Sequence, residues 1–265
     1  SVAIGDSALA TQNFTTATDS YNTAVGYFAG NAVTTGQYNT FVGNASGDAV
    51  TDADENVAVG YNSLSTNTLG NRTVAIGTGA LRDMNFTTAT DSHNTAVGHS
   101  SGQAVSTGTN NTFVGSNSGV ANTTGGDNVF MGYRTGDANT TASGNVAIGK
   151  DAFTTNVAGA RNTALGTATL ANMTSATAAN MYNTAVGYGA GTSVTSGTEN
   201  TLLGSQAGEA LTTGTTNVAL GSQALKVDTK GNNSIAIGYG ALKTQNFSTS
   251  TSTGNIAIGY DAGLS

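Results

Sequence analysis

The residue types that most often carry catalysis are scarce in this chain. Its only two histidines, His93 and His99, occupy places where other parts of the sequence have tyrosine, and we interpret them as surface residues. His93 follows Asp91 and Ser92, but adjacent residues cannot adopt the geometry of a Ser-His-Asp triad. We therefore expect no catalytic residue and no enzyme.

One acidic group, Asp52, Asp54 and Glu55, offers the oxygen ligands that Ca²⁺ prefers. It occurs once and lacks the spacing of a calcium-binding loop, so we interpret it as a solvated turn and expect neither a metal ion nor a cofactor. The net charge of −7 disfavours nucleic acid as a partner. The sequence also lacks an apolar run of the length that spans a bilayer, so we expect no membrane insertion by this segment.

Tyrosine is the residue type whose spacing could support binding. It directly follows the same repeated glycine at six positions, which are Tyr27, Tyr61, Tyr133, Tyr188, Tyr239 and Tyr260. Exposed tyrosine rings would offer flat amphipathic faces to a sugar or a protein. The alternative, which we favour, is that these rings pack across a subunit boundary or over the neighbouring turn.

A short repeat sets the positions of these residues. Its form at residues 22–26 is Asn-Thr-Ala-Val-Gly, and its last residue, called the marker glycine below, occurs fifteen times with spacings of 17 or 21 residues. The marker glycines are Gly5, Gly26, Gly43, Gly60, Gly77, Gly98, Gly115, Gly132, Gly149, Gly166, Gly187, Gly204, Gly221, Gly238 and Gly259. A fixed short period is typical of a solenoid. We expect an all-β parallel solenoid with 17- and 21-residue coils, forming one continuous domain over residues 1–265.

The residues before each marker glycine predict a strand with two apolar faces. The residue one before is always apolar, and the residue two before is alanine in eleven copies and Phe or Leu in the others. Successive strand residues point to opposite faces, so both faces must be covered. One face lines the coil, and another copy of the chain is the simplest cover for the other. We expect the Ala/Phe column to face the other chains, through Ala24, Phe41, Ala58, Phe113, Phe130, Ala147, Leu202 and Ala219.

Three further features of the repeat predict local structure. Asparagine stands four before the marker in twelve copies and is expected to stack as a ladder. A second short strand is expected at residues 31–34, closed by a turn at Gly36. Three of the four 21-residue coils carry a phenylalanine, at Phe14, Phe86 and Phe247, which we expect to be buried in protruding loops.

The segments Ser-Val-Ala-Ile-Gly at 1–5, Asn-Val-Ala-Ile-Gly at 145–149 and Ser-Ile-Ala-Ile-Gly at 234–238 resemble the YadA-like head repeats of trimeric autotransporter adhesins. The Asn-Thr-Ala-Val-Gly-Tyr copies with Thr-Thr-Gly turns are also similar to repeats of phage tail-fibre shafts. The resemblance covers essentially the whole chain. It implies a left-handed parallel β-roll, assembled as a parallel homotrimer.

The resemblance also implies an extracellular adhesive role, at a bacterial outer membrane or on a virion tail fibre. We expect a structural fibre segment, part of a longer protein, that carries a binding surface for a glycan or protein receptor. Two other functions stay open. An enzymatic tailspike acting on polysaccharide would need clustered carboxylates, and an ice-binding solenoid would need a flat threonine array.

Overall fold

The structure is a computed structural model that describes residues 1–16, 18–175 and 179–264. Its described residues form strands, turns and bends and contain no helix. The chain divides into two compact units, Ser1–Asn128 and Val129–Ser265. Each unit is described below by itself, and the continuity of the array over residues 1–265 stays a prediction.

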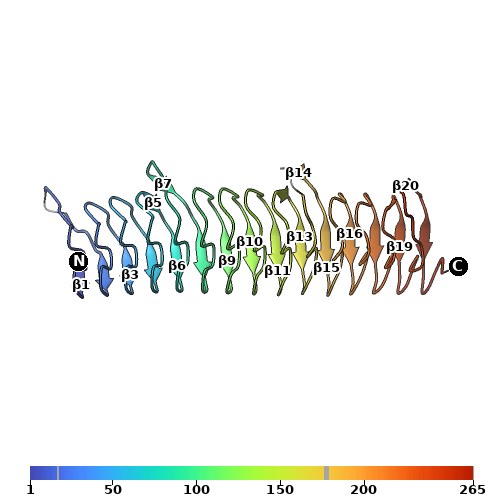
Figure 1. Ribbon diagram of the computed structural model, residues 1–265, viewed down its shortest axis with the longest axis horizontal. Helices are drawn as coiled ribbons and strands as arrows, with labels where there is room; N and C mark the ends of the chain where they lie inside the picture. The colour runs from blue at the N-terminus through green and yellow to red at the C-terminus, as the bar shows by residue number, and fades with distance from the viewer. Residues whose placement is uncertain (17, 176–178, 265) are drawn as a thin grey trace. The chain divides into compact units, whose positions relative to one another are not determined.

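The first unit contains seven three-residue strands that pair in parallel (Figure 1). They are β1 (Val2–Ile4), β2 (Thr23–Val25), β3 (Thr40–Val42), β4 (Val57–Val59), β6 (Val74–Ile76), β8 (Thr95–Val97) and β9 (Thr112–Val114). Equivalent positions of the repeat face each other: Ala24 pairs with Phe41, and Phe41 pairs with Ala58. The repeat therefore fixes the register.

The second unit repeats this arrangement with eight strands. They are β10 (Val129–Met131), β11 (Val146–Ile148), β13 (Thr163–Leu165), β15 (Thr184–Val186), β16 (Thr201–Leu203), β17 (Val218–Leu220), β19 (Ile235–Ile237) and β21 (Ile256–Ile258). Neighbouring strands again pair in parallel at equivalent positions. The expected all-β parallel solenoid is confirmed, with about fifteen turns in the two units together.

The second strand expected at residues 31–34 does not form, since these residues adopt turn and bend conformations. Two-residue strands occur instead where a 21-residue coil meets the coil before it, on the side opposite the main strands (Figure 1). They are the pairs β5 (Gly70–Asn71) with β7 (Thr90–Asp91), β12 (Gly159–Ala160) with β14 (Ala179–Asn180), and β18 (Gly231–Asn232) with β20 (Thr251–Ser252). In the first 17-residue coil, single backbone contacts replace a strand, such as Thr34 N donating to Thr51 O at 3.0 Å.

The core lies along one column of the main strands. We call the position two before each marker glycine the inner column. From Ala24 onward its side chains are buried within the chain itself, and Phe41, Phe113, Phe130 and Leu202 are its largest members. Burial of this column stabilises the coils, together with buried apolar side chains outside it such as Val33 and Leu64.

The size of the residue in the inner column is linked to the size of the residue four after the marker glycine. Phe41 lies beside Gly30 and Gly47, and a Cβ on Gly30 would lie 2.7 Å from Phe41 Cδ2. Where the inner column has Ala58, that position holds the buried Leu64. Its backbone is left-handed in both cases, with φ of 58° at Gly47 and 55° at Leu64. A large residue in one place thus requires a small one in the other, which close packing demands.

The marker glycine is required by the close approach of successive coils. Gly43 has φ of +133°, a conformation that residues with a Cβ rarely adopt. A Cβ on Gly43 would also lie 2.6 Å from the carbonyl oxygen of Gly60 in the next coil. The same approach recurs from Gly60 to Gly77, which explains why this position is glycine in every copy.

The asparagine ladder is confirmed and is buried. In most coils the backbone N–H of the Asn donates to the side-chain oxygen of the Asn one coil earlier, at 2.8 Å from Asn39 to Asn22 and 3.0 Å from Asn217 to Asn200. Asn94, which follows the coil with Thr73, donates instead to Ser92 Oγ at 3.4 Å. The Asn200 Nδ2 donates in turn to Gly214 O at 2.8 Å. These hydrogen bonds satisfy buried polar groups that would otherwise be unpaired.

The expected burial of the phenylalanines in the long loops is confirmed in part. Phe86 is buried near Gly70, whose lack of a side chain leaves room for the ring. Phe14 and Phe247 are only half-buried, so the expectation of burial is too strong for them. Phe247 lines an open pocket of about 430 Å³, which leaves part of its ring uncovered.

Candidate interaction surface

The Ala/Phe column cannot be the contact face between chains. Ala24, Phe41, Ala58, Phe113, Phe130, Ala147, Leu202 and Ala219 are all completely buried inside a single chain. The expectation that these residues face other copies is wrong, because their side chains lie inside their own coil. Both columns are apolar, so alternation alone could not say which one the turn folds inward.

The position one before each marker glycine, called the outer column here, points away from the coil. Ile76, Leu165 and Leu203 are 37%, 43% and 42% exposed. The outer column holds Ile4, Val25, Val42, Val59, Ile76, Val97 and Val114 in the first unit, and Met131, Ile148, Leu165, Val186, Leu203, Leu220, Ile237 and Ile258 in the second. An apolar stripe of this kind is typical of an interaction surface.

The six tyrosines that follow marker glycines are all exposed. They are Tyr27, Tyr61, Tyr133, Tyr188, Tyr239 and Tyr260. Two of them stack, since Tyr239 and Tyr260 have ring centroids 5.2 Å apart and ring planes inclined by 13°. These rings lie open to solvent in the single chain, and their use in binding stays a prediction.

A second surface column was missed by sequence reasoning. It stands five before the marker glycine and is called the turn column here. In the first unit its members are exposed and have left-handed backbone: Tyr21, Tyr38, Glu55, Arg72, His93, Asn110 and Asp127. The only signal in the sequence is the Asn that follows in most coils, because the residue types in the column vary.

Neighbouring members of the turn column contact each other between coils. The rings of Tyr21 and Tyr38 stack with centroids 5.3 Å apart and an interplanar angle of 16°. Asn110 Nδ2 donates to Asp127 Oδ1 at 3.1 Å. In the second unit, Arg161 Nη1 donates to the Tyr182 hydroxyl at 2.9 Å. Residues of the turn column therefore contact each other in pairs between neighbouring coils, although their residue types vary.

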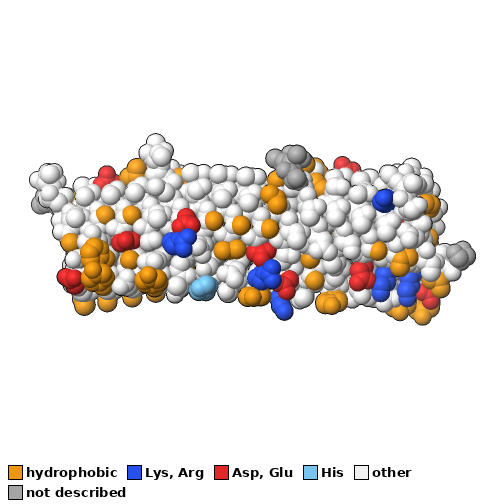
Figure 2. All heavy atoms as spheres, in the orientation of Figure 1, with side chains coloured by type: hydrophobic (Ala, Val, Ile, Leu, Met, Phe, Trp, Pro, Cys, Tyr) orange, Lys and Arg blue, Asp and Glu red, His pale blue; other side chains and the backbone are white. Residues whose placement is uncertain are grey.

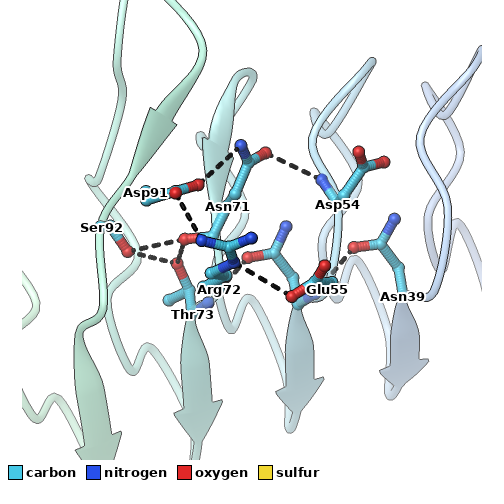
Figure 3. A network of polar contacts seen from close by, with 9 residues as sticks. Asn39, Asp54, Glu55, Asn71, Arg72, Thr73, Asp91 and Ser92 are labelled. Carbon is cyan, nitrogen blue, oxygen red and sulfur yellow. Dashed lines mark hydrogen bonds and ion pairs between the residues drawn. The ribbon is translucent and has the colours of Figure 1, made fainter.

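Arg72 joins three coils in the most connected part of this column (Figure 3). Its guanidinium donates to Glu55 Oε2 at 3.1 Å and to Asp91 Oδ2 at 2.5 Å. The hydrogen bond with Glu55, followed by the charge of Asp91, raises the pKa of Arg72. All three side chains are exposed, so these ion pairs are expected to contribute little to stability.

The acidic group does not converge on one point. Asp52 Oδ1 accepts from the hydroxyls of Thr34 and Thr35, at 2.7 and 2.5 Å, and these hydrogen bonds lower the pKa of Asp52. Asp54 Oδ1 accepts from the Gln37 backbone N–H at 2.7 Å, and Glu55 binds Arg72. Within the described residues, no group of three His, Cys, Asp or Glu side chains is placed to hold a metal ion.

The two histidines lie on the surface, as expected. His93 belongs to the turn column and His99 follows a marker glycine, and both are exposed. Ser92 is buried, and its hydroxyl donates to Asn71 O at 3.1 Å. Asp91 binds Arg72, so the three adjacent residues 91–93 have separate partners.

No family model matches this chain, and no curated protein matches it. In the described part of the chain, no helix has the length and hydropathy that would be required to cross a membrane.

Proposed function

We propose that this chain is a structural and adhesive fibre segment, in which three parallel copies associate through their outer columns. Each copy would be a left-handed β-roll of 17- and 21-residue coils. The proposal places the assembly outside the cell, at a bacterial surface or on a virion tail fibre, where it binds a glycan or protein receptor. It assigns the chain no catalytic role.

The observation that carries the proposal is the apolar outer column, whose side chains are exposed or only partly buried in the single chain. It recurs at the same place in each coil, so identical chains placed side by side in register would meet with like residues at like heights. Association would remove about fifteen apolar side chains from water. Each Å² of apolar surface buried in this way contributes roughly 25 cal/mol to the stability of the assembly. The repeat pattern that resembles adhesin heads and tail-fibre shafts supports the same assembly.

Native mass spectrometry tests the assembly. We expect the three-chain mass for the unmodified protein and the one-chain mass for a variant with Leu203→Asp and Leu220→Asp. Both leucines belong to the outer column and are 42% and 40% exposed, so the substitutions leave the core intact. Thr213→Asp, at an exposed position outside that column, is the matched control and should keep the three-chain mass.

A folded, soluble monomer of the unmodified chain at micromolar concentration would overturn the trimer. The adhesive part has a separate test, which is the binding of fluorescently labelled protein to intact cells. If the labelled protein binds none of the bacterial and eukaryotic cell types in the panel, the adhesive role is overturned and a structural segment remains.

A further inference from the structure

The four 21-residue coils share a tripeptide as well as their length. Each carries Asn-X-Ser or Asn-X-Thr with an apolar residue at X, at residues 13–15, 85–87, 172–174 and 246–248. In all four, the Asn and the Ser or Thr are exposed, while the residue between them is buried or half-buried. The central residue therefore packs against the coil, and both polar side chains of the tripeptide lie in solvent.

The long loops make these side chains easy to reach. The loop before β7 projects beyond the neighbouring coils (Figure 1), and Figure 2 shows it standing clear of the molecular surface. This loop contains Asn85 and Thr87, and it leads to β7 on the side opposite the main strands. A group attached to Asn85 would therefore leave the outer column uncovered.

The polar groups of these tripeptides have no protein partner that would compete for them. In the part of the chain that the structure describes, the four Asn Nδ2 groups and the four hydroxyls donate no hydrogen bond to protein. Asn85 Oδ1 accepts from the Thr68 hydroxyl at 2.8 Å, and Asn246 Oδ1 accepts from the Thr229 hydroxyl at 3.0 Å. These two hydrogen bonds hold the amide by its oxygen and leave its nitrogen available.

The chain has six further tripeptides of this kind, at residues 44–46, 71–73, 110–112, 122–124, 139–141 and 232–234, and each has at least one of its two polar side chains occupied or buried. The buried side chains are Ser46, Thr73, Asn122, Asn139 and Ser234. In the remaining tripeptide, Asn110 Nδ2 donates to Asp127 Oδ1 at 3.1 Å. An available amide and an available hydroxyl therefore coincide only in the four long coils.

We propose that Asn13, Asn85, Asn172 and Asn246 are sites of N-linked glycosylation. Asn-X-Ser/Thr in a surface loop is the pattern to which enzymes attach sugar. The co-substrate is a sugar activated at C1 as a diphosphate ester. The Asn Nδ2 forms a bond to C1 and loses a proton to the enzyme, while the C1–O bond breaks and the diphosphate leaves with the bonding electrons. The free hydroxyl two residues later distinguishes the acceptor from other asparagines.

This inference goes beyond the proposed function. It names a modification that the chain carries, whereas the adhesive role concerns a receptor that the chain binds. It also does not depend on three-chain assembly. Sugars on the long loops and association through the outer column would use different faces of the coil, so both can occur on one chain.

The first test treats the folded, unmodified chain with UDP-glucose and an N-glycosyltransferase specific for Asn-X-Ser/Thr, and locates added hexose by peptide mass spectrometry. We expect hexose at the four long-coil asparagines and none in the other six tripeptides. Thr87→Val should abolish the hexose at Asn85, and Thr87→Ser is the matched control that should retain it. Hexose at none of the ten asparagines, or at all ten alike, would overturn the proposal.

The second test is the mass of the chain isolated from the cells that make it. A single hexose at each site would indicate a nucleotide-activated sugar as the donor, and a larger oligosaccharide would indicate a lipid-linked one. Absence of sugar from all four sites would overturn the proposal. Native mass spectrometry reads the assembly separately: a glycosylated monomer would overturn the trimer and keep the sites, whereas a trimer without sugar would do the reverse.

Discussion

The inner and outer columns of the main strands differ by one residue in sequence and have opposite environments. Phe41 is completely buried, whereas the next residue, Val42, is only partly covered. The inner column varies among alanine, phenylalanine and one leucine, while the outer column holds aliphatic residues and one methionine. The difference shows that the size of a buried side chain can vary where a neighbouring position compensates for its volume. Gly47 leaves room for Phe41, and Leu64 accompanies the small Ala58.

The sharpest test of this comparison replaces neighbouring residues on the two faces. Phe41→Ala removes a completely buried ring and should lower the free energy of unfolding by about 3–5 kcal/mol. Val42→Ala should lower it by about 1 kcal/mol or less, because the side chain is partly exposed. Thermal and urea unfolding followed by circular dichroism measure both changes. Equal effects would contradict the assignment of the inner and outer faces.

A double-mutant cycle tests whether the side chains at positions 41 and 47 occupy the same space. Gly47→Leu alone should destabilise the chain, since a Cβ at Gly47 would overlap the Phe41 ring. With Phe41→Ala in the same chain, the coil acquires the Ala-and-Leu pattern of Ala58 and Leu64. We expect a coupling energy of about 1–3 kcal/mol that makes the double variant more stable than the sum of the single effects predicts. Simple additivity would show that the two positions do not share one space.

The buried polar ladder allows a matched comparison within one column. Asn200→Ala removes the acceptor of the Asn217 N–H and the donor to Gly214 O, so we expect a loss of about 2 kcal/mol. Asn56 accepts from the Thr73 N–H, but its Nδ2 has no hydrogen-bond partner. Asn56→Ala should therefore cost less than Asn200→Ala. The reverse order of unfolding midpoints would contradict the hydrogen-bond assignment.

The smallest effects are expected from two carboxylates of one coil. Hydroxyl hydrogen bonds lower the pKa of Asp52, so its contribution is present above its unfolded pKa and is lost as the pH falls through the folded pKa. Burial raises the pKa of Asp48, so its ionised form opposes folding at neutral pH. At pH 7, Asp52→Asn should lower the free energy of unfolding and Asp48→Asn should raise it, each by less than about 1 kcal/mol. Midpoints recorded between pH 2 and 7 check the signs, and both differences should shrink in acid.

Sequence periodicity predicts much of this fold. The marker glycine predicts the coil boundary, because only glycine tolerates both its backbone angle and the carbonyl oxygen of Gly60. The Asn column predicts the ladder. Periodicity could not decide whether Ala24 or Val25 points inward, since both positions are apolar. It also predicted a strand at residues 31–34, where isolated coil-to-coil hydrogen bonds suffice.

The candidate surface was predictable only where residue types repeat. Tyr27 and Tyr61 share a position in the repeat, so their column is visible in the sequence, and both are exposed. Tyr21 and Tyr38 belong to a column that also holds Glu55 and Arg72, so no pattern of residue types marks it. What unites this column is left-handed backbone and outward side chains, and that is a property of the coil.

The asparagine ladder also has a mechanical consequence. In most rungs the backbone N–H of one coil donates to the side chain of the coil before it, as from Asn39 to Asn22 and from Asn56 to Asn39. A pulling force applied to the C-terminal end of a unit would act on one rung at a time. Each detached 17-residue coil would lengthen the tether by roughly 60 Å. A single-molecule extension record should therefore rise in small, nearly equal steps, and a single large step would show that the coils yield together.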